Sequence, residues 1–165
     1  MTTKDSRTAR LSDAKRPDPI LMLRSDLRAV RSLFAQFQKA RSAAEKKAIV
    51  QQICLALTVQ SQLEEEILYP ALMKAFHDKE LVPKAREQLA TLRALIAEVQ
   101  GIEPDDDYET NVRMISDYVK NRVAAQTQIL PRTRSARIDL GALGAQIASR
   151  KQELLAQLSE FGGWD

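Results

Sequence analysis

Three consecutive glutamates, Glu64, Glu65 and Glu66, interrupt an otherwise apolar, helix-forming stretch of the chain. The apolar residues around them recur at helical spacing, and Gln60 and Glu64 share that apolar face, four residues apart. Two polar side chains one turn apart on an inward face are how helical bundles build a metal site. Such a site would need a liganding nitrogen where the chain has Gln60. The stretch therefore raises the question of whether other helices supply the missing ligands.

The composition is typical of a globular helical protein. The chain has 165 residues, of which 44% are hydrophobic and 28% charged, and only five are glycine. This length predicts one domain large enough to bury a core, and the many Ala, Leu, Gln, Arg and Lys residues favour helix. No secretory signal is recognisable, and no apolar run approaches the ~20 residues of a membrane span. We therefore expect a soluble cytoplasmic protein.

The positive charge is concentrated in one segment. Residues 1–17 contain five basic and two acidic residues, which accounts for the whole net charge of +3. The rest of the chain is balanced, so no specific nucleic-acid-binding face is expected. We predict a disordered basic tail at 1–17, a helical domain at 18–160 and a short tail at 161–165. The alternative for the basic tail is weak attraction to an anionic surface.

Apolar periodicity predicts five helices, at about residues 19–40, 43–75, 82–99, 107–134 and 140–158. Asp18 and Ser42 are predicted N-caps, the second in a capping box with Glu45. Pro70 is expected to kink or restart the second helix. Four long helices with short links predict an all-α, antiparallel up-down four-helix bundle with an additional carboxyl-terminal helix.

Nucleophiles and imidazoles are scarce in this sequence. Cys54 is the only cysteine and lies in an apolar helical run, which predicts a small buried hydrophobic residue. His77 is the only histidine and falls in a predicted loop, where a lone imidazole makes a poor metal site. Neither a nucleophile–base pair nor a phosphate-binding glycine loop nor zinc-ligand spacing is present. We therefore expect no catalytic residues.

Residues 64–70 combine three acids, an apolar pair, a tyrosine and a proline, and residues 125–131 end on a similar apolar pair and proline. Residues 64–70, together with residues 25–34 and 118–132, resemble the hemerythrin-like (HHE cation-binding) domain family. The resemblance extends over about residues 19–158. The resemblance implies a di-iron centre inside the bundle, held by histidines and two carboxylates. It also implies oxygen or nitric oxide binding, iron handling or redox sensing.

The ligand positions that the resemblance implies are almost all occupied by residues that cannot serve. They fall on Leu27, Gln60, Glu64, Gln88, Asn121, Arg122, Ala125 and Gln126. Leu27 offers no lone pair, and the amides of Gln60 and Gln88 are weak neutral ligands. The guanidinium of Arg122 stays positively charged in proteins. Glu64 is the one ligand of the family that this chain retains. On the fourth helix, the alignment leaves open whether Asn121 or Arg122 occupies the position of the family's histidine. We predict that no metal and no cofactor is bound.

A carboxylate that is buried without its metal needs another partner. We predict that Arg122 pairs with Glu64 across the bundle, with Gln60, Gln88 and Gln126 completing the hydrogen bonds and Leu27 closing the apolar side. The alternative is that Arg122 points to solvent while Glu64 is protonated or bridged by water.

The sequence therefore predicts a hemerythrin-fold protein that has lost its di-iron centre. Its expected role is a non-catalytic binding or regulatory module that acts through a protein partner, a homo-oligomer or a small ligand in the vestigial pocket, without a membrane. Two alternatives remain. The first is an iron-binding hemerythrin-like protein with a non-standard site, to which residues 64–66 and loop acids could contribute. The second is an enzyme of another kind.

Overall fold

The computed structural model describes residues 18–76, 81–104, 106–135 and 138–160. The predicted tails at 1–17 and 161–165, His77, and the side chains of residues 125–130 lie outside the described part. The elements are α2 (Pro19–Lys39), α3 (Ala43–Leu63), the π-helix η1 (Glu64–Leu68), α4 (Tyr69–Phe76), α5 (Leu81–Gln100), α6 (Asp106–Ser135) and α7 (Leu140–Glu160). The described residues form helices without a strand, which confirms the all-α class.

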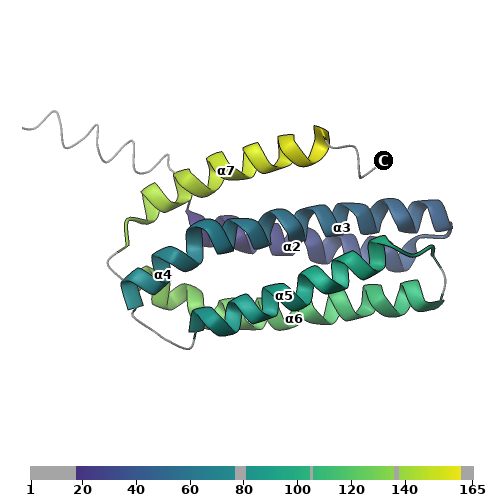
Figure 1. Cartoon of the computed structure of the whole chain (residues 1–165), viewed down its shortest axis with the longest axis horizontal. Coiled ribbons are helices and arrows are strands. Elements are labelled where there is room, and N and C mark those ends of the chain that lie inside the picture. Colours follow the sequence, from purple (N-terminus) through teal and green to yellow (C-terminus); the bar gives the residue numbers. More distant parts are fainter. Residues whose placement is uncertain (1–17, 77–80, 105, 136–137, 161–165) are drawn as a thin grey trace, which may run out of the picture.

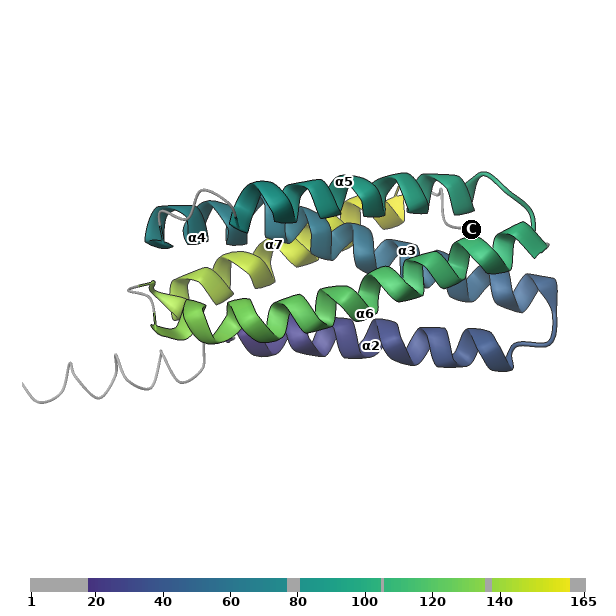
Figure 2. The same ribbon diagram turned by 90° about the horizontal axis from the view of Figure 1, so that it is seen from below.

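The long helices lie side by side, and successive ones run in alternating directions (Figures 1 and 2). α2 packs along α3, α5 packs along α6, and α6 also contacts α2. α7 lies outside this group, against α2, α3 and η1. Among the described helices, none is long and apolar enough to cross a membrane.

Two predicted caps fix where α2 and α3 begin. The carboxylate of Asp18 accepts a hydrogen bond from the backbone N–H of Ile20 at 2.8 Å, and the hydroxyl of Ser42 accepts one from Glu45 at 3.1 Å. Both bonds satisfy amides that the first helical turn leaves unpaired. The carboxylate of Glu45 accepts a bond in return, but from the N–H of Arg41 at 3.2 Å. The capping box is therefore closed one residue earlier than its usual form.

The predicted kink at Pro70 takes the form of a π-helical segment, and the chain stays helical from Ala43 to Phe76. Proline has no N–H, so it cannot donate to the carbonyl of Glu66 as an α-helical residue would, and its ring crowds that carbonyl. The preceding residues adopt wider turns, in which the N–H of Tyr69 donates to the carbonyl of Glu64, five residues back. The segment contains all three glutamates of the acidic run.

Buried apolar side chains form two clusters along the helices. One cluster fills the half of the molecule where α3 begins, and it includes Leu27, Cys54 and Tyr108. The other lies under α7 and around α4, and it includes Leu63, Tyr69 and Ile147. Cys54 is fully buried, as its apolar surroundings in the sequence predict. The buried Glu64 of η1 follows Leu63 and precedes Leu68, two residues of the second cluster.

Candidate functional site

Glu64 and Arg122 form a buried ion pair between η1 and α6. Glu64 is the first residue of the π-helix and is 1% exposed, while Arg122 is 8% exposed. The Nη2 atom of Arg122 contacts the Oε2 atom of Glu64. The pair predicted from the sequence is therefore present, and the alternative in which Arg122 points to solvent is wrong.

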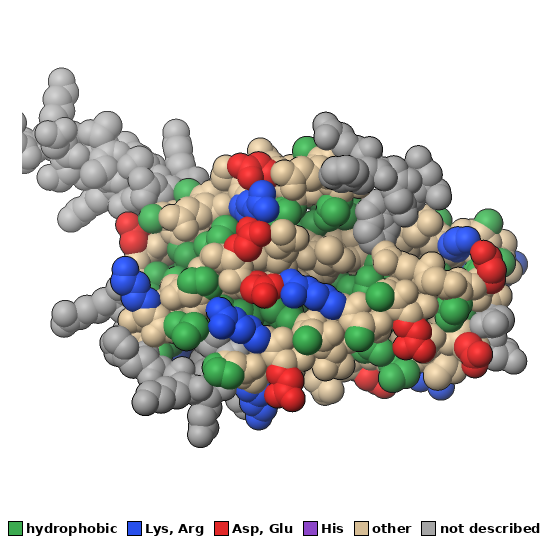
Figure 3. Space-filling model, viewed as in Figure 1, with side chains coloured by type: hydrophobic (Ala, Val, Ile, Leu, Met, Phe, Trp, Pro, Cys, Tyr) green, Lys and Arg blue, Asp and Glu red, His purple; other side chains and the backbone are tan. Residues whose placement is uncertain are grey.

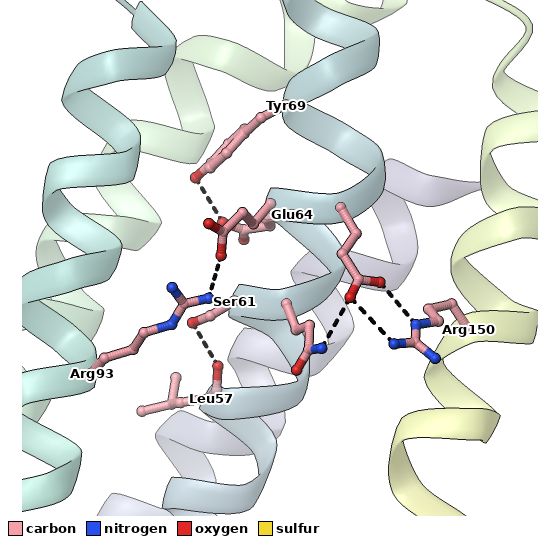
Figure 4. Close-up of polar contacts among 9 residues, drawn as sticks. Leu57, Ser61, Glu64, Tyr69, Arg93 and Arg150 are labelled. Atoms are coloured by element: carbon pink, nitrogen blue, oxygen red, sulfur yellow. Dashed lines mark hydrogen bonds and ion pairs between the residues drawn. The ribbon is translucent and has the colours of Figure 1, made fainter. Parts of the chain in front are cut away.

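Tyr69 is the third member of this buried cluster. Its hydroxyl donates to Oε2 of Glu64 at 2.8 Å (Figure 4). The same hydroxyl accepts a hydrogen bond from Nη2 of Arg122. The guanidinium also lies over the tyrosine ring, with Cζ 5.8 Å from the ring centroid. In the wider π turn, a residue five positions after Glu64 comes above it, so η1 places the phenol against the carboxylate. We call Glu64, Tyr69 and Arg122 the buried triad.

Burial keeps the tyrosine neutral and leaves the arginine charged. Desolvation raises the pKa of Tyr69 well above its usual range, so at neutral pH the phenol keeps the proton that it donates to Glu64. Desolvation lowers the pKa of Arg122 to about 10, which still leaves the guanidinium positive at neutral pH. A positive group and a neutral donor thus converge on one carboxylate oxygen.

The other two glutamates of the run pair with arginines of two further helices. Glu65 pairs with Arg93 of α5, and Glu66 accepts bonds from Arg150 of α7 at 2.8 and 3.2 Å. Gln62 also donates to Glu66 at 2.9 Å. These bonds, from Arg150 first and then from Gln62, lower the pKa of Glu66. Figure 4 shows Arg93 and Arg150 on opposite sides of the acidic segment.

Three consecutive carboxylates are therefore bound by three arginines from α6, α5 and α7. On the face seen in Figure 3, acidic and basic side chains lie next to one another, not in separate patches. The ion pairs of Glu65 and Glu66 are partly exposed to solvent, whereas the ion pair of Glu64 is buried. The acidic run is a junction between helices, which apolar periodicity alone does not reveal.

The remaining predicted positions occupy different environments. Leu27 is buried in the core, and Gln60 is buried one turn before Glu64. Gln88 is half-buried, because the neighbouring Leu89 is the residue of α5 that points into the core. The amide Nε2 of Gln60 has no hydrogen-bond partner in the described part, so this donor does not make the predicted bond to Glu64 there. Within the described residues, Tyr69 supplies the hydrogen bonds to the ion pair.

Two neighbouring residues of α6, Asn121 and Arg122, differ in exposure. Asn121 is exposed and Arg122 is buried, so Arg122 holds the inward position. Ala125 and Gln126 fall among the residues whose side chains are not described. The predicted bond from Gln126 therefore lies outside the described part of the chain.

Three buried polar atoms lack hydrogen-bond partners among the described residues: Nε2 of Gln60, Oε1 of Glu64 and the hydroxyl of Tyr118. Gln60 precedes Glu64 by one turn on α3, and Tyr118 precedes Arg122 by one turn on α6. Burial raises the pKa of Tyr118 to about 12. Tyr118 also contributes to the raised pKa of Tyr69. Polar side chains thus extend about one turn beyond the buried triad along both helices.

The donor set of this region does not fit a di-iron centre. Two cations need several carboxylates and imidazoles, but the inward positions here hold one carboxylate, an amide, a leucine and a guanidinium. The positive charge of Arg122 contacts the carboxylate that a cation would need. Among the described residues, no group of three His, Cys, Asp or Glu side chains could hold a metal ion.

Comparison with known proteins gives one distant relative. The chain is 24% identical over 110 residues to a protein named DNA nickase from Nostoc sp. (strain PCC 7120 / SAG 25.82 / UTEX 2576). The match covers 66% of this chain but 31% of that protein, so the chain spans about a third of its relative. No family model and no solved structure matches the chain.

We predict that Arg122→Met lowers the free energy of unfolding by about 3–5 kcal/mol, because it leaves the carboxylate of Glu64 buried without a counter-charge. Replacing the whole buried triad, with Glu64→Met and Tyr69→Phe added, should recover most of that loss, since no charge then remains buried. Urea denaturation measures both values.

Arg93→Met is the matched control for Arg122→Met. Arg93 pairs with Glu65 of the same run, but the two side chains are 51% and 39% exposed, so we expect a change of about 0–1 kcal/mol. Equal losses for Arg93→Met and Arg122→Met would contradict a special role for the buried pair.

We predict that Tyr118→Phe keeps or raises stability, by up to about 1 kcal/mol, because it removes a buried hydroxyl without a described partner. Tyr69→Phe should instead lose about 1.5–3 kcal/mol, because its hydroxyl is bonded to a charged carboxylate. Urea denaturation at pH 7 distinguishes the two variants, and a larger loss for Tyr118→Phe would refute the prediction.

Comparing the natural sequence with Tyr118→Phe also tests stability at alkaline pH. The pKa of Tyr118 is raised from 10.0 to about 12, so the folded state favours the neutral phenol. The preference of the folded state for the neutral phenol therefore costs no stability below pH 10. The free energy of unfolding falls as the pH rises from 10 through about 12, because the unfolded chain loses the phenol proton first. Tyr118→Phe should reduce the loss of stability over this range.

Proposed function

We propose that this chain is a hemerythrin-like protein without the di-iron centre, and that it works as a non-catalytic binding or regulatory module. In this proposal α2, α3 with η1 and α4, α5 and α6 form the antiparallel up-down four-helix bundle of that family, and α7 is an addition to it. The protein acts in the cytoplasm through a protein partner, a second copy of itself or a small ligand.

The observation that carries the proposal is the contact between Arg122 and Glu64. Glu64 is the one ligand-type residue that the resemblance retains, and its charge is already met by a guanidinium and a phenol of the same chain. A metal ion at this point would have to displace Arg122 into a largely apolar interior. Burying a guanidinium without a partner costs several kcal/mol, which opposes metal uptake.

The proposal separates the scaffold from the chemistry. In a di-iron protein the metal joins the helices, whereas here side-chain pairs from α5, α6 and α7 join them to the acidic segment. The helices then need no cofactor to hold their arrangement. A scaffold of this kind can bind a partner or ligand without carrying out redox chemistry.

We predict that the purified protein contains no stoichiometric iron and that its melting temperature does not rise with added Fe²⁺ under anaerobic conditions. A bound ligand stabilises the state that it binds, so even modest affinity would raise the melting temperature. Elemental analysis and thermal denaturation are the measurements. One or two irons per chain, with an iron absorption band, would support the iron-binding alternative.

The positive control for the iron assay is a variant in which the family's ligands are restored. It combines Leu27→His, Gln60→His, Gln88→His, Arg122→His and Gln126→Glu. Under the proposal this variant takes up iron that the natural sequence does not. If the variant folds and still binds no iron, the alignment of these positions with the family's ligands is wrong.

The distant relative supplies a second candidate function, because its name describes cleavage of one DNA strand. Under our proposal, the purified chain leaves supercoiled plasmid intact in the presence of Mg²⁺ or Mn²⁺, and gel electrophoresis shows no open-circular product beyond a mock purification. Nicking that follows the protein through purification would favour the second candidate.

A further inference from the structure

A cavity of about 320 Å³ lies between α3, the end of α5 and the start of α6. Figure 1 shows that α3 begins and α5 ends at the same end of the molecule, and the residues that line the cavity belong to this end. Its nearest approach to the buried triad along α3 is Cys54, ten residues before Glu64, or roughly 15 Å of helix. The volume is at the lower end of the ~300–1,000 Å³ range of small-molecule sites.

The floor of this cavity is apolar and uncharged. Val50, Cys54, Val99 and Tyr108 line it and are themselves almost fully buried. Burial raises the pKa of the Cys54 thiol and of the Tyr108 phenol to about 12, so neither carries charge at neutral pH. The valines and the cysteine are short side chains, which leave space that a leucine or phenylalanine would fill.

The rim of the cavity is polar and includes one cation. Lys47, Gln51 and Gln100 stand beside the apolar floor. Lys47 pairs with Glu103 at 3.4 Å, but the side chains are 46% and 84% exposed, so the pair contributes little energy. A carboxylate on a bound molecule could therefore replace Glu103 as the partner of Lys47, with the two amides as further donors.

We propose that this cavity binds a small amphipathic monocarboxylate, with its apolar chain on the floor and its carboxylate at Lys47. The site is separate from the buried triad, so the result of the iron assays does not decide it. It gives the proposed binding module a ligand site at a different place from the vestigial metal pocket.

Octanoate is the probe. Titrating it into the full chain, with methyl groups labelled for NMR, should shift the signals of Val50, Val99 and Ile102 in a saturable way. Lys47→Gln should weaken binding about fivefold or more, the equivalent of losing one partly exposed charge pair of ~1 kcal/mol. Lys84→Gln, at an exposed lysine on α5 that does not line the cavity, is the control and should bind as the natural sequence does.

Two further comparisons keep the proposal falsifiable. Val50→Phe should fill the floor and abolish binding while circular dichroism shows an unchanged helical fold, and 1-octanol should bind more weakly than octanoate and be insensitive to Lys47→Gln. The proposal is overturned if octanoate shifts no cavity methyls, if the shifts map elsewhere, or if Lys47→Gln and Lys84→Gln behave alike. Octanol binding as tightly as octanoate would overturn the role of Lys47.

Discussion

A carboxylate that is almost completely removed from water constrains this structure more than any other group. Burying an unpaired charge costs several kcal/mol, so Glu64 requires a counter-charge within contact and a donor for its oxygen. Arg122 and Tyr69 supply them from α6 and from the next turn of the same helix. The demand of one side chain thus fixes how η1, α4 and α6 lie relative to one another.

The local backbone serves the same interaction. Pro70 removes an amide that an α-helix would use, and the chain accommodates the loss with wider turns through residues 64–68. Those turns bring Tyr69 over Glu64. A proline that would be a defect in a regular helix therefore places a hydrogen-bond donor on the buried charge. Irregular π turns of this kind are frequent at functional sites, and here the segment begins at Glu64, one of the positions where the family resemblance expects a metal ligand.

The parts of the structure that follow from local rules could be predicted from the sequence. The caps at Asp18 and Ser42 and the buried Cys54 depend on neighbouring residues and on apolar periodicity. The pairing of Arg122 with Glu64 could also be predicted, because a buried carboxylate admits few partners and Arg122 stands on an inward stripe. The π-helix and the role of Tyr69 could not, since Pro70 is equally compatible with a kink. The sequence positions of Gln60 and Gln88 predict hydrogen bonds to the ion pair. In the structure, Nε2 of Gln60 has no described partner, and Leu89 points into the core in place of Gln88.

The three neighbouring glutamates have a further consequence for how this segment tolerates change in length. Successive side chains of a helix are separated by ~100° around its axis, so one inserted or deleted residue turns everything beyond it by that angle. Because Glu64, Glu65 and Glu66 each face an arginine on a different helix, a deletion before them would misdirect all three contacts together. Substitutions here act on single pairs, whereas a change in length acts on the whole junction. The number of residues between Ser42 and Pro70 is therefore as much a part of the fold as their identity.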